Sequence, residues 1–253
     1  MLRKMSDLMD FAVQARDGEV GKVDDFYFDD NEWHVRYFVV KTGPWLFGRR
    51  VLVSPVAFDK PIWSTETIPV ILTQKQVKNS PDIDLDKPVS RQQEVDLTTY
   101  YNWPAYWPAT PAFFNQSAVG VMAPVAAPVA TKEQTQTRDK SEIGDPNLRS
   151  VSEVTGYGIH ATDGMIGHVE DFFVDERDWS IRLVMVDTRD WLPGKKVLIS
   201  PDWVERVSWN DSQVHVKVTQ DTVRNSQEYD PDGGVGRNGG AGAGLYTYGE
   251  IQR

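Results

Sequence analysis

The 253-residue sequence contains no cysteine, and it has only four histidines. The absence of cysteine excludes disulfide bonds, thiolate metal ligands and cysteine nucleophiles, and it fits a protein of a reducing compartment such as the cytoplasm. No two histidines have the sequence spacing of metal ligands. We therefore expect a cytoplasmic protein without a bound metal or cofactor.

Long apolar runs and an excess of positive charge are also missing. No stretch reaches the roughly 20 apolar residues that a membrane helix needs; the best candidate, residues 118–130, is broken by two prolines. The first residues lack the continuous apolar region of a signal peptide. The net charge of −10 repels phosphate backbones. We expect neither a transmembrane segment nor direct binding to nucleic acid.

The sequence does contain a repeat. Residues 15–55 recur as residues 161–201, in the register that matches Asp17 with Asp163, and this register continues without a gap to Ser80 and Ser226. About 40% of the positions are identical over about 66 residues, far above chance self-similarity. Each repeat has about 70 to 80 residues, which makes its core marginal by itself. The chain is thus expected to hold two homologous domains.

Turn signals divide each repeat into short runs rich in β-branched and aromatic residues, which predict strands. The expected strands are 11–15, 19–29, 33–42, 50–54 and 68–72 in the first repeat, and 157–161, 165–175, 179–188, 196–200 and 213–218 in the second. Short helices are expected at 73–79 and 219–225, and Ser90 with Gln93 forms a capping-box pattern that starts a third. Ser6 is a candidate cap for one helical turn at the N-terminus. The prediction is a mainly β fold of two small antiparallel barrels, each followed by short helices.

Composition sets the expected domain boundaries. Residues 1–107 hold the first repeat with a helix and an aromatic tail, and residues 150–230 hold the second repeat. Residues 108–149 are rich in proline and alanine and predict a flexible linker, while residues 231–253 are a glycine-rich tail. Two arrangements stay open: the repeats pack on each other within one chain, or they exchange partners in a homodimer.

The repeats carry the patterns DGxxGxVxDFxxD, WxxRxxVVxTxxWLxGRxVLxSP and TxxxVxNS. These patterns resemble the PRC-barrel family, which is named for the cytoplasmic part of the photosynthetic reaction centre H subunit and also occurs in a ribosome-maturation protein. The resemblance covers residues 10–84 and 156–230, and residues 94–107 are similar to the tail that follows the barrel in tandem bacterial members. It implies a roughly six-stranded barrel per repeat, used for docking or scaffolding without a shared catalytic site. The second repeat lacks a comparable tail.

Acidic residues cluster in the predicted turns. The clusters are Asp24, Asp25, Asp29, Asp30 and Glu32, and their counterparts Glu170, Asp171, Asp175, Glu176 and Asp178. Their oxygens suit a hard cation, or they cap turns and pair with bases. Arg36 and Arg182 lie within apolar strands, where we expect structural pairs with Asp25 and Asp171 rather than an anion clamp.

Five aromatic residues occur within residues 100–107, namely Tyr100, Tyr101, Trp103, Tyr106 and Trp107. They either cover an exposed strand edge of the first barrel or form a docking patch, because Tyr and Trp are enriched at interfaces. We interpret them as the candidate interaction surface.

The expected function is that of a non-catalytic scaffold or adaptor that mediates protein association or self-assembly, with a partner that the sequence does not identify. The alternative is a small-ligand or cation-binding module that uses the acidic turns. An enzyme is the third and weakest hypothesis, because the sequence shows no combination of nucleophile, base or cofactor motif. The GxGxxG match at residues 234–239 follows no predicted strand and precedes no helix, as a dinucleotide site requires.

Overall fold

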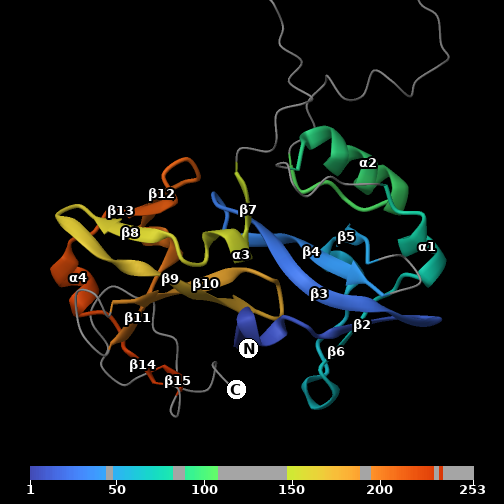
Figure 1. Cartoon of the computed structure of the whole chain (residues 1–253), viewed down its shortest axis with the longest axis horizontal. Helices are drawn as coiled ribbons and strands as arrows, with labels where there is room; N and C mark the ends of the chain where they lie inside the picture. Colours follow the sequence, from blue (N-terminus) through green and yellow to red (C-terminus); the bar gives the residue numbers. More distant parts are fainter. Residues whose placement is uncertain (44–47, 82–88, 108–146, 189–194, 231–233, 236–253) are drawn as a thin grey trace, which may run out of the picture.

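The computed structural model describes residues 1–43, 48–81, 89–107, 147–188, 195–230 and 234–235. The predicted linker and glycine-rich tail lie mostly outside these described residues. The fold is mainly β, as predicted, and it consists of a six-stranded and a seven-stranded sheet beside each other with a few short helices (Figure 1).

Five of the six strands in the six-stranded sheet come from the first repeat, and the sixth, described below, pairs with β3. Its strand order is β5 (Arg50–Val53), β4 (His34–Thr42), β3 (Gly18–Asp29), β2 (Ala12–Ala15) and β6 (Thr67–Pro69). The predicted antiparallel arrangement is wrong for one pair, because β6 lies parallel to β2. After β5 the chain crosses through the 3₁₀ turns η3 (Pro55–Ala57) and η4 (Trp63–Thr65) to the far edge. In the described part of the chain this strand path does not close into a barrel.

Six strands of the seven-stranded sheet come from the second repeat, in the equivalent order with β12 added at one edge, and the seventh, described below, pairs with β9. It runs β11 (Lys196–Ile199), β10 (Ile181–Asp187), β9 (Gly164–Asp175), β8 (Gly158–Ala161), β13 (Gln213–Val216) and β12 (Val204–Ser208), with the turn η6 (Pro201–Trp203) after β11. β13 is parallel to β8, so the antiparallel prediction fails here too. β12 was not predicted, and β14 (Tyr229–Asp230) and β15 (Gly234–Val235) form a separate pair.

A glycine at the equivalent position of each repeat allows the long strands β3 and β9 to approach their neighbouring strands closely. A β-carbon at Gly21 would lie 2.1 Å from the Lys41 carbonyl oxygen, and one at Gly167 would lie 2.0 Å from the Asp187 carbonyl oxygen. Both distances are far below van der Waals contact. At Gly21 and at Gly167 two backbones therefore touch and a side chain is excluded.

The short helices begin where the sequence predicts. Thr73 and Ser90 each form a capping box, at the starts of α1 (Gln74–Lys78) and α2 (Arg91–Tyr101). Thr219 caps α4 (Gln220–Arg224), and α3 (Val151–Val154) was not predicted. Among the described residues, no helix is long and apolar enough to span a bilayer.

The N-terminal segment and the start of the second repeat differ from the prediction. Ser6 is not a cap; the segment forms β1 (Leu2–Lys4) and the turn η1 (Ser6–Leu8). β1 pairs with β9 of the second repeat. β7 (Leu148–Ser150), which straddles the predicted end of the linker at residue 149, pairs with β3 of the first repeat. Each sheet thus gains a strand from the other repeat.

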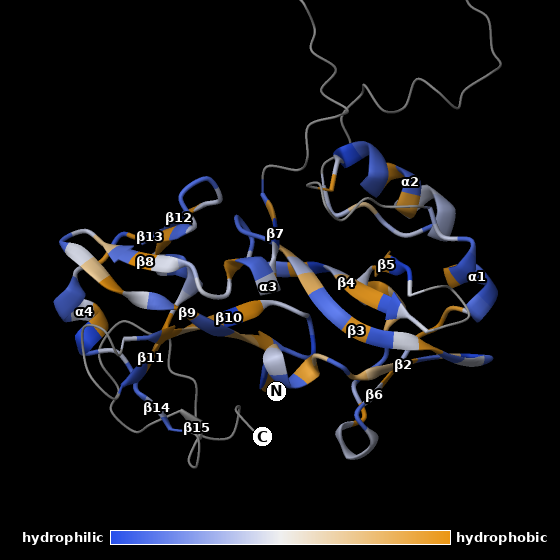
Figure 2. Ribbon diagram, viewed as in Figure 1, coloured by the Kyte–Doolittle hydropathy of each residue, from blue (hydrophilic) through white to orange (hydrophobic). Residues whose placement is uncertain are grey.

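The two repeats share one hydrophobic core. The Phe28 ring lies 5.5 Å from the Phe172 ring, and the Phe38 ring lies 4.7 Å from the Trp179 ring. These residues belong to a continuous cluster of buried side chains from both sheets, and the hydropathy view shows apolar residues along the strands of both (Figure 2). The repeats therefore pack on each other within the chain.

Candidate interaction site

Helix α2 lies over the outer face of the first sheet, above β4 and β5 (Figure 1). Tyr37, Val39 and Leu52 point outward from these strands and cluster with Val89 and Leu97 of the helical segment. The capping box at Ser90 fixes where the helix begins, and with this start Leu97 lies on the side of the helix that faces the sheet. Helix α2 thus covers part of the outer face of the first sheet, with Leu97 and Glu94 buried in the contact.

A carboxylate is buried in this contact. Glu94 is fully buried and accepts hydrogen bonds from the hydroxyls of Tyr37, at 3.0 Å, and Tyr106, at 2.6 Å. Arg91 neutralises it, with its guanidinium nitrogen 2.8 Å from Glu94 Oε2. Burial and the nearby Glu94 charge raise the pKa of Tyr37 well above its usual value. The Tyr37 hydroxyl therefore stays a proton donor to Glu94.

The end of the aromatic tail is held by cations. The Arg36 guanidinium lies 4.1 Å from the centre of the Tyr106 ring, and that of Arg91 lies 4.5 Å from the Trp107 ring. The Tyr101 ring stacks on Trp103 at 4.1 Å, and burial raises the pKa of Tyr101 to about 12. The tail is thus fixed to the first repeat by stacking as well as by burial.

The five aromatic residues are not equivalent. Tyr101, Trp103 and Tyr106 pack inward against the protein. Tyr100 is 40% exposed, and Trp107 is half-buried at the end of the described tail. The tail covers a sheet face rather than the strand edge that the first sequence hypothesis named. The second hypothesis, a docking patch, stays a prediction, and it now concerns Tyr100 and Trp107.

The predicted pairs of Asp25 with Arg36 and of Asp171 with Arg182 are wrong. In the strand register Asp25 faces Val39, so Arg36 lies several residues further along β4. Arg36 pairs instead with Glu32 and Asp29 at the hairpin end. Arg182 pairs with Asp178, at 2.7 Å, by the same geometry.

Asp25 and Asp171 each bind the other repeat. Ser152 donates its backbone N–H to Asp25 at 3.0 Å, and the hydroxyls of Ser150 and Ser152 add two more hydrogen bonds. Asp171 accepts from the backbone N–H of Ser6, at 3.2 Å, and from the Ser6 hydroxyl. Burial raises the pKa of Asp171, and the Ser6 hydrogen bonds oppose that rise.

Other acidic turn residues also have protein partners. Asp24 pairs with Arg50, and Glu170 pairs with the equivalent Lys196. The part of the chain that the structure describes places no group of three or more His, Asp or Glu residues as metal ligands. A cavity of about 540 Å³ lies beside Glu170 and Asp171; its further lining residues are Lys4, Ser6, Met185, Lys196, Glu228 and Tyr229.

Two histidines whose sequence spacing gave no sign of contact, His160 and His215, lie next to each other in the structure. His160 on β8 faces His215 on β13, and their ring centres lie 5.7 Å apart. Arg206 contacts His215 at 3.1 Å. The parallel pairing of β8 with β13 brings them together, and that pairing leaves no local signal in the sequence.

Sequence reasoning also missed the segments that cross between the repeats. Leu2-Arg3 and Ser6 have exact equivalents in Leu148-Arg149 and Ser152, in the register already known from Asp17 and Asp163. Extending the repeat toward the N-terminus of each unit would have exposed this signal.

Residues 3–63 match the family model of the PRC-barrel domain, a match that begins within β1 and includes β2 to β5. The match confirms the resemblance for the first repeat, while the same assignment for the second repeat stays a prediction. No curated protein matches the chain.

Proposed function

We propose that this chain, whose residues 3–63 match the PRC-barrel domain, is a non-catalytic scaffold or adaptor that mediates protein association or self-assembly. The PRC-barrel is a scaffold kind of fold, but a fold by itself does not determine function. The support therefore has to come from the surface of this chain.

The aromatic tail carries the proposal. It holds the exposed Tyr100 ring and the half-buried Trp107 ring in place while its inward residues pack on the sheet. Aromatic rings held in place in this way lose little conformational entropy on binding and are typical anchors of protein interfaces.

The non-catalytic part of the proposal is supported by the hydrogen bonds of three carboxylates that are buried or partly buried. Glu94, Asp25 and Asp171 each receive hydrogen bonds from protein donors that hold structural segments together. Together with the acidic charge and the lack of cysteine, this supports a cytoplasmic protein that binds other proteins.

The test compares outward and inward rings. Tyr100→Ser with Trp107→Ser removes the exposed Tyr100 ring and the half-buried Trp107 ring, and Tyr101→Ser with Tyr106→Ser is the matched inward control. Light scattering measures the mass of each protein over a range of concentrations, and chemical cross-linking in the native cell identifies bound proteins. We expect the outward variant to lose association with only a small fall in melting temperature, because it loses the Tyr100 and Trp107 contacts with Gln76 and Arg91, and the inward variant to melt much earlier. If the outward variant keeps both the mass and the cross-linked partners of the wild type, the tail is not the binding surface.

The cavity beside Glu170 and Asp171 favours a second candidate function, the binding of a small ligand or cation. A thermal-shift series with calcium, manganese and small amino acids tests it. Saturable stabilisation that Glu170→Gln abolishes would support this function, and an unchanged melting temperature across the series would oppose it.

A further inference from the structure

The two repeats hold each other by one contact that is made twice. We define arm 1 as residues 2–8 and arm 2 as residues 148–154. Arm 1 adds β1 to β9 of the second repeat, with Leu2 facing Asp175. Arm 2 adds β7 to β3 of the first repeat, with Leu148 facing the equivalent Asp29. Each repeat therefore gives one arm and receives one.

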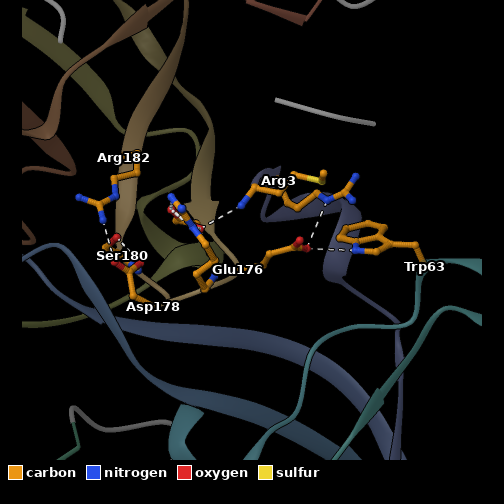
Figure 3. A network of polar contacts seen from close by, with 9 residues as sticks. Arg3, Trp63, Glu176, Asp178, Ser180 and Arg182 are labelled. Carbon is orange, nitrogen blue, oxygen red and sulfur yellow. Dashed lines mark hydrogen bonds and ion pairs between the residues drawn. The ribbon is translucent and has the colours of Figure 1, made fainter. Parts of the chain in front are cut away.

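The arginine of each arm pairs with an acid of the other repeat. Arg3 Nε lies 3.4 Å from Glu176 Oε2, and Arg149 Nε lies 3.0 Å from Asp30 Oδ2. The Arg3 guanidinium also lies 4.0 Å from the centre of the Trp63 ring, whose N–H donates to Glu176 at 3.2 Å (Figure 3). Charge complementarity thus contributes to the fit of each arm against the other repeat.

Two further positions of the arms have the same role in both. Met5 and Val151 are buried in the shared core. Ser6 and Ser152 bind Asp171 and Asp25 with both backbone N–H and hydroxyl. The arms share the pattern Leu-Arg-x-apolar-Ser. In each case the opposite repeat has one acid that pairs with the arginine and another that binds the serine.

The contact is also reciprocal at its centre. The N–H of Val35 donates to the Trp179 carbonyl at 2.9 Å, and that of Ile181 donates to the Trp33 carbonyl at 2.7 Å. Both tryptophans adopt positive φ, 53° for Trp33 and 60° for Trp179, which is unusual for a bulky residue. A surface that makes equivalent contacts in both directions is the kind that forms symmetric dimers.

We propose that this reciprocal surface is also where the chain associates with itself, with the first repeat of one chain pairing with the second repeat of another. This proposal rests on the self-assembly part of the proposed function and names a second copy of the chain as the partner. The same arms, acids and tryptophan carbonyls meet whether the repeats belong to one chain or to two. The balance between the two forms is therefore set mainly by the tether between the repeats.

The shared core determines when the exchange takes place. Separating the repeats would expose Phe28, Phe172 and Trp179 to water, so assembled chains exchange slowly. A tethered repeat is present at an effective concentration on the order of millimolar. Exchanged dimers then form when chains fold close together, and isolated chains close on themselves.

A charge swap across the arm tests the proposal in the full chain. Arg3→Glu places two acids at the Arg3–Glu176 contact, and Glu176→Arg places two bases there. In an exchanged dimer of the two variants, Glu at position 3 of one chain meets Arg at position 176 of the other, and the remaining Arg3 meets the remaining Glu176. The variants are unfolded and refolded separately and as an equal mixture. One variant carries an affinity tag.

The expected result is a mixed two-chain particle in the co-refolded sample, at least about tenfold more abundant than the dimer of either variant alone. This is the ratio that about 1.4 kcal/mol produces. The double variant Arg3→Glu with Glu176→Arg restores the pair both within one chain and between two chains and is the control; we expect it to form monomers and dimers in the same proportion as the wild type. If the single variants aggregate when refolded alone, recovery of soluble mixed dimer on co-refolding is the supporting result.

A co-refolded mixture that contains only monomers or only aggregates would overturn the proposal. That outcome leaves the aromatic-tail test untouched, because the contacts of Tyr100, with Gln76 and Tyr101, and those of Trp107, with Tyr106 and Arg91, involve neither arm. Failure of the exchange and failure of the scaffold function are therefore distinguishable.

Discussion

Ser6 reaches Asp171, 165 positions away, with both its hydroxyl and its backbone N–H. Ser152 makes the equivalent contact with Asp25 in the opposite direction. Two carboxylates that resemble surface acids in the sequence thus fasten each repeat to the other. The most direct predictions concern this pair of contacts.

We expect Ser6→Ala and Ser152→Ala each to lower the free energy of unfolding by about 1 to 2 kcal/mol, because each removes one hydroxyl bond to a carboxylate, buried Asp171 or partly buried Asp25. Urea unfolding followed by tryptophan fluorescence measures the loss. Ser208, whose hydroxyl bonds the exposed Asp211, provides the control; Ser208→Ala should change stability by less than about 0.5 kcal/mol. Equal effects at all three serines would contradict the role of the arms.

The raised pKa of Asp171 should be visible in the pH dependence of the free energy of unfolding. Burial raises its pKa, so between the unfolded value of about 3.9 and the raised folded value the folded chain binds more protons than the unfolded chain. Its contribution to stability therefore falls as the pH rises through that window and is constant above it. We expect the stability of the wild type relative to Asp171→Asn to decline in this way in urea titrations at a series of pH values. A difference that grows with pH would contradict the assignment.

Asp175 provides a control of opposite sign. Hydrogen bonds from Arg177 hold the pKa of Asp175 well below its usual value. Its contribution is therefore present above the unfolded pKa of about 3.9 and is lost as the pH falls toward the folded value. The stability of the wild type relative to Asp175→Asn should decrease on acidification, opposite to the behaviour of Asp171→Asn.

Removal of the buried carboxylate should release the aromatic tail. Glu94→Ala leaves the hydroxyls of Tyr37 and Tyr106 without their acceptor, and we expect a loss of roughly 2 to 4 kcal/mol. Glu94→Gln keeps an acceptor and should lose less. Gln92, exposed on the same helix, is the control position, and Gln92→Ala should be nearly neutral. Limited proteolysis after Tyr101 measures the release, and equal protection of Glu94→Ala and the wild type would contradict this prediction.

The close approach of backbones at Gly21 and Gly167 predicts a steep cost for the smallest side chain. A β-carbon at either position would overlap a carbonyl oxygen, so Gly21→Ala and Gly167→Ala should each lose about 3 kcal/mol or more. Gly158, where the nearest atom is 3.5 Å away on the Met165 side chain, is the matched control. Gly158→Ala should cost less than about 1 kcal/mol, as thermal unfolding would show.

Local patterns in the sequence predicted most of the strands and the starts of the helices. The turn at Asp17-Gly18 and the β-rich run before Thr42 depend on neighbours in the chain, and so do the capping boxes at Thr73 and Ser90. The repeat and the family patterns were visible for the same reason, because both are properties of residue order. The aromatic tail was recognised as a feature, although which of its rings face inward was not.

The partners of the charged residues had to await the tertiary structure. Asp25 was assigned to Arg36 because both lie in one repeat, whereas the strand register separates them and the arm of the other repeat supplies Ser150 and Ser152. The parallel pairing that joins His160 to His215, and the crossing of β1 and β7, depend likewise on segments far apart in the chain. Residue order specifies local conformation and the apolar faces, but the choice among distant partners follows from burying one core between two repeats, which is a property of the whole folded chain.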